Sequence, residues 1–184
     1  MRKRVLAFAL VICLLFGVMP MSANAASNSS TASTTVYYTV DSYYEVVIPS
    51  AINLNEEDGF QFSATSCSLP SGKVLYIAVD REKTFDGGTY FCLFQNKGLE
   101  NEKKIACYLR VSSSKEDMSY TEIKGSPGSS QIVAVFQNGN LNPILRGYLR
   151  FHCSPSSNTP AGTYSGQIYF NIYLDDPSHY TENS

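Results

Sequence analysis

Residues 160–174, which read Pro-Ala-Gly-Thr-Tyr-Ser-Gly-Gln-Ile-Tyr-Phe-Asn-Ile-Tyr-Leu, decide the fold class. After the Pro-Ala-Gly turn, apolar and polar side chains alternate with a period of two, which is the pattern of a half-buried β-strand. One side of this strand carries Tyr164, Ile168, Phe170, Ile172 and Leu174, with Gly166 in phase. The other side carries Gln167, Tyr169, Asn171 and Tyr173. The stretch therefore predicts a β-strand whose apolar side is buried against a hydrophobic core.

The same period recurs along the chain between turn residues. It predicts strands at 36–48 (one strand, or two broken near Asp41-Ser42), 60–64, 75–79, 89–95, 104–111, 131–137 and 145–153. No segment after the N-terminal region keeps a helical period over ten residues. We therefore predict an all-β, immunoglobulin-like antiparallel β-sandwich of seven to nine strands over residues 36–174, with a small barrel as the alternative. Residues 112–130, rich in Ser, Gly, Lys and Glu, are predicted to form a long exposed loop.

The N-terminus has the three-part layout of a secretory signal peptide. Three basic residues at 2–4 precede an apolar run at 5–18, and Ala23-Asn24-Ala25 supplies a small-residue cleavage pattern. The run is short for a membrane span of about 20 residues. We expect a signal peptide at 1–25, a flexible polar leader at 26–35 and a polar tail at 175–184, and hence a secreted or cell-surface protein. A retained N-terminal anchor is the alternative.

The composition narrows the class of partner. Without residues 1–25 the chain keeps 11 basic and 16 acidic residues, a net charge of −5, and it has no basic cluster. This charge argues against nucleic acid and against anionic membrane surfaces. The mature chain has no segment apolar enough to span a membrane. It holds no Trp but many Tyr and Phe residues.

Four cysteines remain after Cys13 leaves with the signal peptide, namely Cys67, Cys92, Cys107 and Cys153. An even number in an exported chain favours disulfides, with free buried thiols and metal binding as alternatives. Strands 89–95 and 104–111 are predicted to form a hairpin. If Gln95 opposes Lys104, Cys92 faces Cys107, which predicts a Cys92–Cys107 disulfide. Cys67–Cys153 is then the second predicted pair, although Cys67 is out of phase with the apolar residues of its strand.

Two segments resemble known secreted proteins. Residues 160–170 resemble the final strand of bacterial surface and pilus-type β-sandwiches, and Val46-Val47-Ile48-Pro49-Ser50-Ala51-Ile52-Asn53-Leu54 is similar to the opening of secreted adhesin-like domains of Gram-positive bacteria. Together they cover about 20 residues. The resemblance implies an immunoglobulin-like fold and a surface location. The chain has no Leu-Pro-x-Thr-Gly sorting signal, so covalent wall anchoring of that kind is not expected.

The sequence offers little evidence for a catalytic site. His152 follows Arg146, Tyr148 and Arg150 in parity and is expected to face solvent, and His179 lies in the polar tail. The chain has no Gly-x-Ser-x-Gly elbow. The acidic residues cluster in turns such as Glu56-Glu57-Asp58, where solvated charge is the simple interpretation and a calcium site the alternative. We therefore expect no enzymatic activity, no metal and no cofactor.

The outward tyrosines of the first and last strands suggest a binding surface. If these strands pair, Tyr37, Tyr43, Tyr169 and Tyr173 form one aromatic face that would stack on sugar rings or anchor a protein. Ordinary cross-strand packing is the alternative. The sequence thus predicts a non-catalytic bacterial surface, pilus-like or adhesion component. Its partner would be an extracellular protein or an envelope component, with self-assembly allowed. A secreted carbohydrate-binding module is the alternative.

Overall fold

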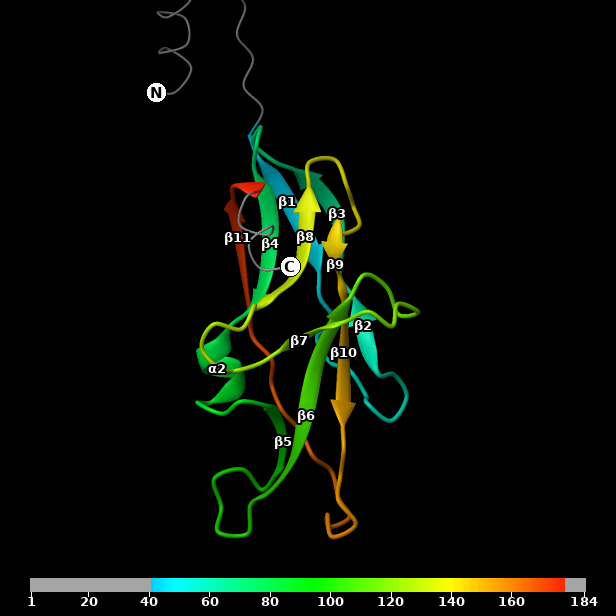
Figure 1. The fold of residues 1–184 in the computed structure, drawn as a ribbon, viewed down its shortest axis with the longest axis vertical. Coiled ribbons are helices and arrows are strands. Elements are labelled where there is room, and N and C mark those ends of the chain that lie inside the picture. Colours follow the sequence, from blue (N-terminus) through cyan, green and yellow to red (C-terminus); the bar gives the residue numbers. More distant parts are fainter. Residues whose placement is uncertain (1–40, 178–184) are drawn as a thin grey trace, which may run out of the picture. The chain divides into compact units, whose positions relative to one another are not determined.

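The computed structural model describes residues 41–177 and confirms an all-β, antiparallel, sandwich-like fold. The predicted signal peptide and leader, Tyr37 and the tail beyond residue 177 lie outside the described residues. Three sheets form within residues 41–177 (Figure 1). The first pairs β1 (Tyr43–Val47) with β3 (Ser63–Ser68). The second runs β2 (Gly59–Gln61), β10 (Tyr148–Cys153), β6 (Lys103–Ser112), β5 (Phe91–Gln95), with β7 (Thr121–Ile123) also on β6. The third runs β11 (Phe170–Asp175), β4 (Val74–Val79), β8 (Ile132–Gln137), β9 (Leu145–Arg146).

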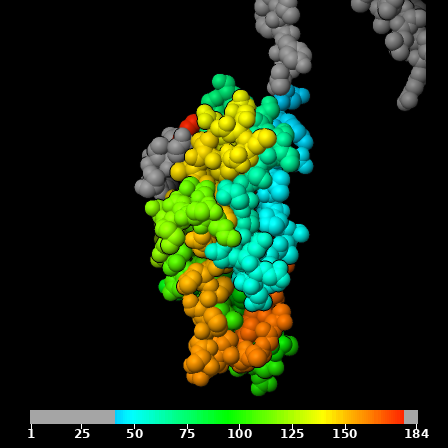
Figure 2. Space-filling view, turned by 90° about the vertical axis from the view of Figure 1, so that its right-hand side faces the viewer, coloured from blue at the N-terminus to red at the C-terminus, as the bar shows by residue number. Residues whose placement is uncertain are grey.

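Two segments each serve more than one sheet. Residues 59–68 pair with β10 as β2 and, after Phe62, with β1 as β3. Residues 145–153 pair with β8 as β9 and, after Gly147, with β2 and β6 as β10. The loop before β9 also follows β3, because Ala64 N donates to Leu141 O and Gly139 N donates to Cys67 O. Figure 2 shows the cyan segment that contains β3 and the yellow loop before β9 side by side on one face.

One core joins the three sheets. Ala64 of β3, Leu109 of β6 and Ile77 of β4 belong to the same cluster of buried apolar side chains. β4 is buried on both sides, as its unbroken apolar run Val-Leu-Tyr-Ile-Ala-Val indicates. Its second side packs Val74 and Tyr76 against β8 in a smaller cluster.

The number of strands is eleven within residues 41–177, more than the seven to nine predicted. Part of the excess arises because two predicted strands are each divided where they change sheets. Another strand, β7, lies in the predicted loop 112–130, where Ile123 is 2 % exposed. The one helix in the described part, α2 (Arg81–Phe85), is a short turn whose N-cap Asp80 accepts a hydrogen bond from Lys83 N.

The final predicted strand begins later than its alternating pattern suggests. β11 starts at Phe170, and upstream of it Ser165 makes an isolated bridge to Phe94 of β5. Gly166 lies so close to β5 that an added Cβ would come within 2.8 Å of Cys92 O. The alternating segment therefore passes the edge of β5 before it pairs with β4. The predicted polar tail is also partly docked, since Asp175 ends β11 and Lys73 Nζ lies 2.9 Å from Asp176 Oδ1.

The predicted Cys92–Cys107 disulfide is wrong. Gln95 opposes Lys103 rather than Lys104, so Cys92 faces Ala106 and Phe91 faces Cys107. A slip of one residue moves every side chain to the other side of a sheet, and Cys92 therefore points outward while Cys107 points into the core. Cys107 instead bonds Cys153, its direct partner across β6 and β10.

The predicted Cys67–Cys153 pair is wrong as well, because Cys67 and Cys92 are free. Cys67 is nonetheless buried in the core, at 7 % exposed. The register of β1 and β3 shifts between Glu45 and Val46, which oppose Ser66 and Ala64 and leave Thr65 as an extra residue. This bulge reverses the phase of the strand, and Cys67 consequently points inward although the sequence places it outward.

Candidate functional site

The outward side of β6 and β10 carries the most distinctive exposed chemistry of the described domain. Along β6 the core residues Cys107 and Leu109 alternate with Tyr108 and Arg110, so the latter two lie on the outer side of the sheet. Across β10, Arg150 opposes Arg110 and His152 opposes Tyr108. We call the following set the Tyr–Arg face: Tyr90, Tyr108, Tyr120, Arg110, Arg150 and His152.

Aromatic contacts tie this surface together. Tyr90 packs edge-on against Tyr108, with ring centroids 5.0 Å apart, and the His152 ring lies 6.3 Å from that of Tyr108. Tyr90 and Tyr120 keep 40 % and 49 % of their surface exposed. Met118, in the loop that leads to β7, is 78 % exposed. Large side chains that stay exposed while ordered by neighbours are typical of protein-binding surfaces.

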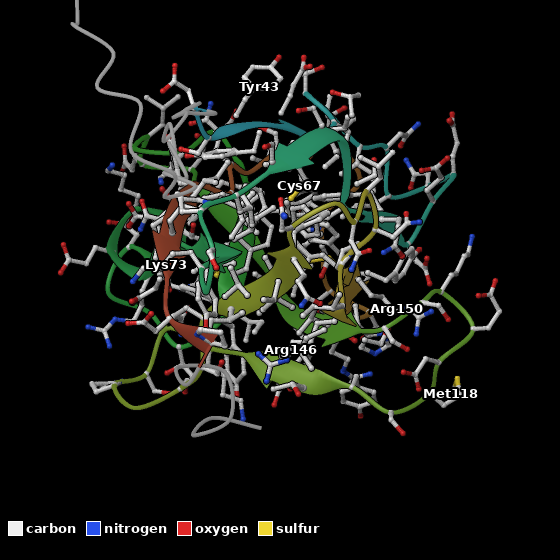
Figure 3. All side chains as sticks on the ribbon, turned by 90° about the horizontal axis from the view of Figure 1, so that it is seen from above. Tyr43, Cys67, Lys73, Met118, Arg146 and Arg150 are labelled. Carbon is white, nitrogen blue, oxygen red and sulfur yellow. A yellow bond between two sulfur atoms is a disulfide. The ribbon has the colours of Figure 1, made fainter. Side chains whose placement is uncertain are left out.

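Arg150 is held by an acid and a carbonyl. Its Nε lies 2.9 Å from Asp58 Oδ2 as an ion pair without hydrogen-bond geometry, and its Nη2 donates to Lys115 O. Figure 3 shows Arg150 and Met118 on the same side of the molecule, away from Tyr43. The loop after β6 is thus fixed against β10.

Asp58 is the anchor of this arrangement. Tyr148 Oη donates to Asp58 Oδ1 at 2.7 Å, and this hydrogen bond, with the charge of Arg150, lowers the pKa of Asp58 although burial opposes the shift. Burial, and next the hydrogen bond to Asp58, raise the pKa of Tyr148 to about 12. Each oxygen of the carboxylate thus has a partner, Tyr148 on Oδ1 and Arg150 on Oδ2.

Arg110 has no such partner within the described residues. Its guanidinium carbon lies 4.3 Å from the ring centroid of Tyr120 and 5.7 Å from that of Tyr108. Its Nε is buried and makes no hydrogen bond. Glu122 opposes it on β7, but the Glu122 carboxylate lies 2.7 Å from Lys124 Nζ. Arg110 is therefore a positive charge within cation–π distance of two tyrosine rings, with its Nε donor unused.

A groove of about 780 Å³ lies along β5, next to this surface; we call it the β5 groove. Tyr90, Phe94 and Tyr169 contribute rings to its wall, and Lys97 lies over the Phe94 ring at 4.7 Å. The free thiol of Cys92 also lines it. Rings beside amides and lysines suit a sugar as well as a peptide.

Of the four predicted tyrosines, the three that the structure describes do not form one face, and Tyr37 lies outside the described residues. β1 pairs with β3 and β11 pairs with β4, so the first and last strands of the described domain are in different sheets. Tyr43 is 59 % exposed on β1, whereas Tyr173 stacks on Tyr76 with ring centroids 5.4 Å apart. Tyr169 lines the β5 groove and donates from its hydroxyl to Gln167 Oε1. The pairing on which the prediction depended is absent from the described strands.

The Tyr–Arg face was missed although a signal for it is in the sequence. The parity of Tyr108 and Arg110 against Cys107 and Leu109 marks them as outward, and the parity of β10 marks Arg150 and His152 in the same way. The sequence does not reveal that β6 and β10 are neighbours, nor that the segment with Tyr120 returns to β6. Those pairings are non-local.

Residues 41–177 contain no group of three His, Cys, Asp or Glu side chains placed to hold a metal ion. His152 is exposed, as its parity predicts, and its Nε2 lies 3.5 Å from Ser154 Oγ. No helix in the described part of the chain is long and apolar enough to cross a membrane. No protein-family model, curated protein or solved structure matches the chain.

Proposed function

We propose that this chain is a non-catalytic extracellular β-sandwich that serves as a bacterial surface, pilus-like or adhesion component and binds a protein partner through the Tyr–Arg face. The observation that carries the proposal is the cluster of exposed and half-buried tyrosines and arginines on the outer side of β6 and β10, with Tyr90 and Tyr120 beside them just before β5 and β7. Tyr and Arg are enriched among the residues that dominate binding energy in protein interfaces. An ordered side chain loses little entropy when a partner covers it.

Two features support an extracellular location. The Cys107–Cys153 bond requires an oxidising environment to persist, and the N-terminal sequence has the layout of a secretory signal. N-terminal sequencing of the exported protein tests this part of the proposal. We expect cleavage after Ala25 or Ala26, so that the chain begins at Ala26 or Ser27, and a secreted chain that still begins at Met1 would contradict the signal.

Binding of the fluorescently labelled protein to cells of the producing bacterium tests the surface. We expect saturable binding that protease treatment of the cells abolishes, because the partner is a protein. Tyr120→Ala should weaken it at least tenfold, the effect of losing a central aromatic contact. Tyr43→Ala is the matched control, since Tyr43 is similarly exposed but lies on a different sheet. Equal binding by both variants would refute the assignment of the surface.

A carbohydrate-binding module is the second candidate, and the β5 groove is the observation that favours it. In that case protease-treated cells still bind the protein, a glycan array gives discrete signals, and Tyr169→Ala removes them. Sedimentation at rising protein concentration tests self-assembly. Association that Tyr120→Ala abolishes would identify a second copy of the chain as the partner.

A further inference from the structure

Arg110 is the least compensated charge on the Tyr–Arg face. Its neighbours across both flanking strands are Arg150 and Glu122, and each of these already has a partner of opposite charge, Asp58 and Lys124. Two arginines directly opposed across an antiparallel pair repel each other. The Arg150 charge is offset by Asp58, whereas the Arg110 charge has no acid within ion-pair distance in the described part of the chain.

The surroundings of Arg110 orient it and reduce its contact with water. The rings of Tyr120 and Tyr108 lie within cation–π distance of the guanidinium, and the side chain as a whole is only partly exposed. Its Nε is buried without a hydrogen-bond partner. A partner outside the domain therefore meets the terminal amino groups of the guanidinium, for which no hydrogen bond forms within the described residues. A planar guanidinium suits an acceptor with two oxygens, because it offers parallel N–H groups.

We propose that Arg110, between Tyr108 and Tyr120, is an anion-binding site that receives a carboxylate from an acidic segment of the protein partner. This inference rests on the proposed function and names the chemistry that the Tyr–Arg face recognises. A glutamate or aspartate side chain supplies the two oxygens, and Tyr120 and Met118 supply apolar contact beside it. A protein segment suits the site better than a sugar acid, since the site lies on an open sheet and outside the residues that line the β5 groove.

The test uses the full exported protein and two capped peptides, triglutamate and triglutamine. In the unmodified protein the Nε–Hε resonance of Arg110 is followed by NMR during each titration, and in every variant the backbone amide resonances of Tyr108 and Tyr120 report binding instead. We expect a saturable shift with triglutamate and none with triglutamine. Arg110→Gln should weaken triglutamate binding about tenfold, the effect of one charge-assisted hydrogen-bonded pair. Arg110→Lys should weaken it as well, because lysine keeps the charge but lacks the fork.

Arg81→Gln is the matched control. Arg81 is an exposed arginine on α2, where it lies beside residues of β4 and β11 and not on the Tyr–Arg face, and its loss should leave triglutamate binding unchanged. Thermal unfolding of each variant verifies that the fold is intact. The inference is overturned if triglutamate gives no saturable shift, if Arg81→Gln weakens binding as much as Arg110→Gln, or if a uronic-acid oligosaccharide or inorganic phosphate binds at Arg110 more tightly than the peptide.

The outcomes separate this inference from the proposed function. If Tyr120→Ala abolishes cell binding and Arg110→Gln does not, the surface is correct and the carboxylate site is wrong. If triglutamate binds at Arg110 but the protein binds no cell or protein, the site is correct and the function of the surface is wrong.

Discussion

Phe62 N donates a hydrogen bond of 2.8 Å to Gly147 O, and this bond joins the two points where strands change sheets. Phe62 separates β2 from β3, and Gly147 separates β9 from β10. Gly147 has a φ of +120°, and an added Cβ would lie 2.7 Å from Pro143 Cγ. A glycine at position 147 is therefore a structural requirement of the fold.

Gly147→Ala should destabilise the domain by about 3 kcal/mol, because it adds a steric overlap to an unfavourable φ. Gly139→Ala is the control. Gly139 also has a positive φ, of +80°, but a methyl group added there would have no atom within 4 Å. We expect that variant to cost about 1 kcal/mol. Urea unfolding measures both, and equal costs would show that Pro143 yields to the new methyl group.

The disulfide provides the second prediction. It closes a loop with a sequence separation of 46, and in the chain-entropy model such a bond stabilises the fold by about 4 kcal/mol. The Cys107→Ala, Cys153→Ala double variant should lose about 2–4 kcal/mol in urea unfolding. Cys92→Ser should lose little, since its thiol forms no disulfide. Non-reducing peptide mapping identifies the bond directly, and a Cys92–Cys107 peptide would refute the register of β5 and β6.

Period-two alternation predicted the fold class and most strands, because it reports which side of each strand is buried. It failed where the partner of a strand decides the outcome. The β5–β6 register depends on a loop in which Asn96 has a φ of +56°, and a change of one residue there moved Cys92 away from Cys107. The bulge at Thr65 reversed the phase of Cys67 in the same way. The Tyr–Arg face requires two non-local pairings, β6 with β10 and β6 with β7, which local patterns do not encode.

The Asp58–Tyr148 pair makes stability depend on pH at both ends of the scale. The pKa of Asp58 is lowered in the fold, so its stabilising contribution is complete above pH 3.8 and is lost as the pH falls through the lower folded value. The pKa of Tyr148 is raised from 10 to about 12, so its contribution is complete below pH 10 and is lost between pH 10 and 12. Tyr148→Phe should therefore raise the pKa of Asp58, and carboxyl NMR titration measures it.

The control for this titration is Tyr43→Phe. Tyr43 lies on β1, and the factors that shift the pKa of Asp58 do not include it. The titration of Asp58 should be the same as in the unmodified protein. An Asp58 pKa that does not move in Tyr148→Phe would mean that the charges of Arg150 and Lys115, and not the hydrogen bond from Tyr148, lower it.

β7 contributes a buried side chain to the core, although it lies within the predicted exposed loop at residues 112–130. Ile123 faces Leu109 across the sheet and is 2 % exposed. Ile123→Ala should cost about 2–5 kcal/mol, because it removes buried methyl groups and leaves a cavity. Ile144→Ala, at a site 42 % exposed, should cost less than about 0.5 kcal/mol. Thermal unfolding measures the loss of stability in both variants. A small loss in Ile123→Ala would favour the predicted long exposed loop at residues 112–130.

The two free thiols should differ in their reaction with iodoacetamide. Cys92 is partly exposed in the β5 groove, whereas Cys67 is buried and its Sγ lies 3.4 Å from Gln137 O. Burial also raises the pKa of the Cys67 thiol, so less of it is the reactive thiolate at neutral pH. At pH 8 the folded protein should be labelled at Cys92 within minutes, and Cys67 should be labelled only after the addition of denaturant. Peptide mass spectrometry assigns the label to each cysteine. Rapid labelling of Cys67 in the folded protein would mean that β3 does not hold it in the core, and the bulge at Thr65 would then not exist in solution.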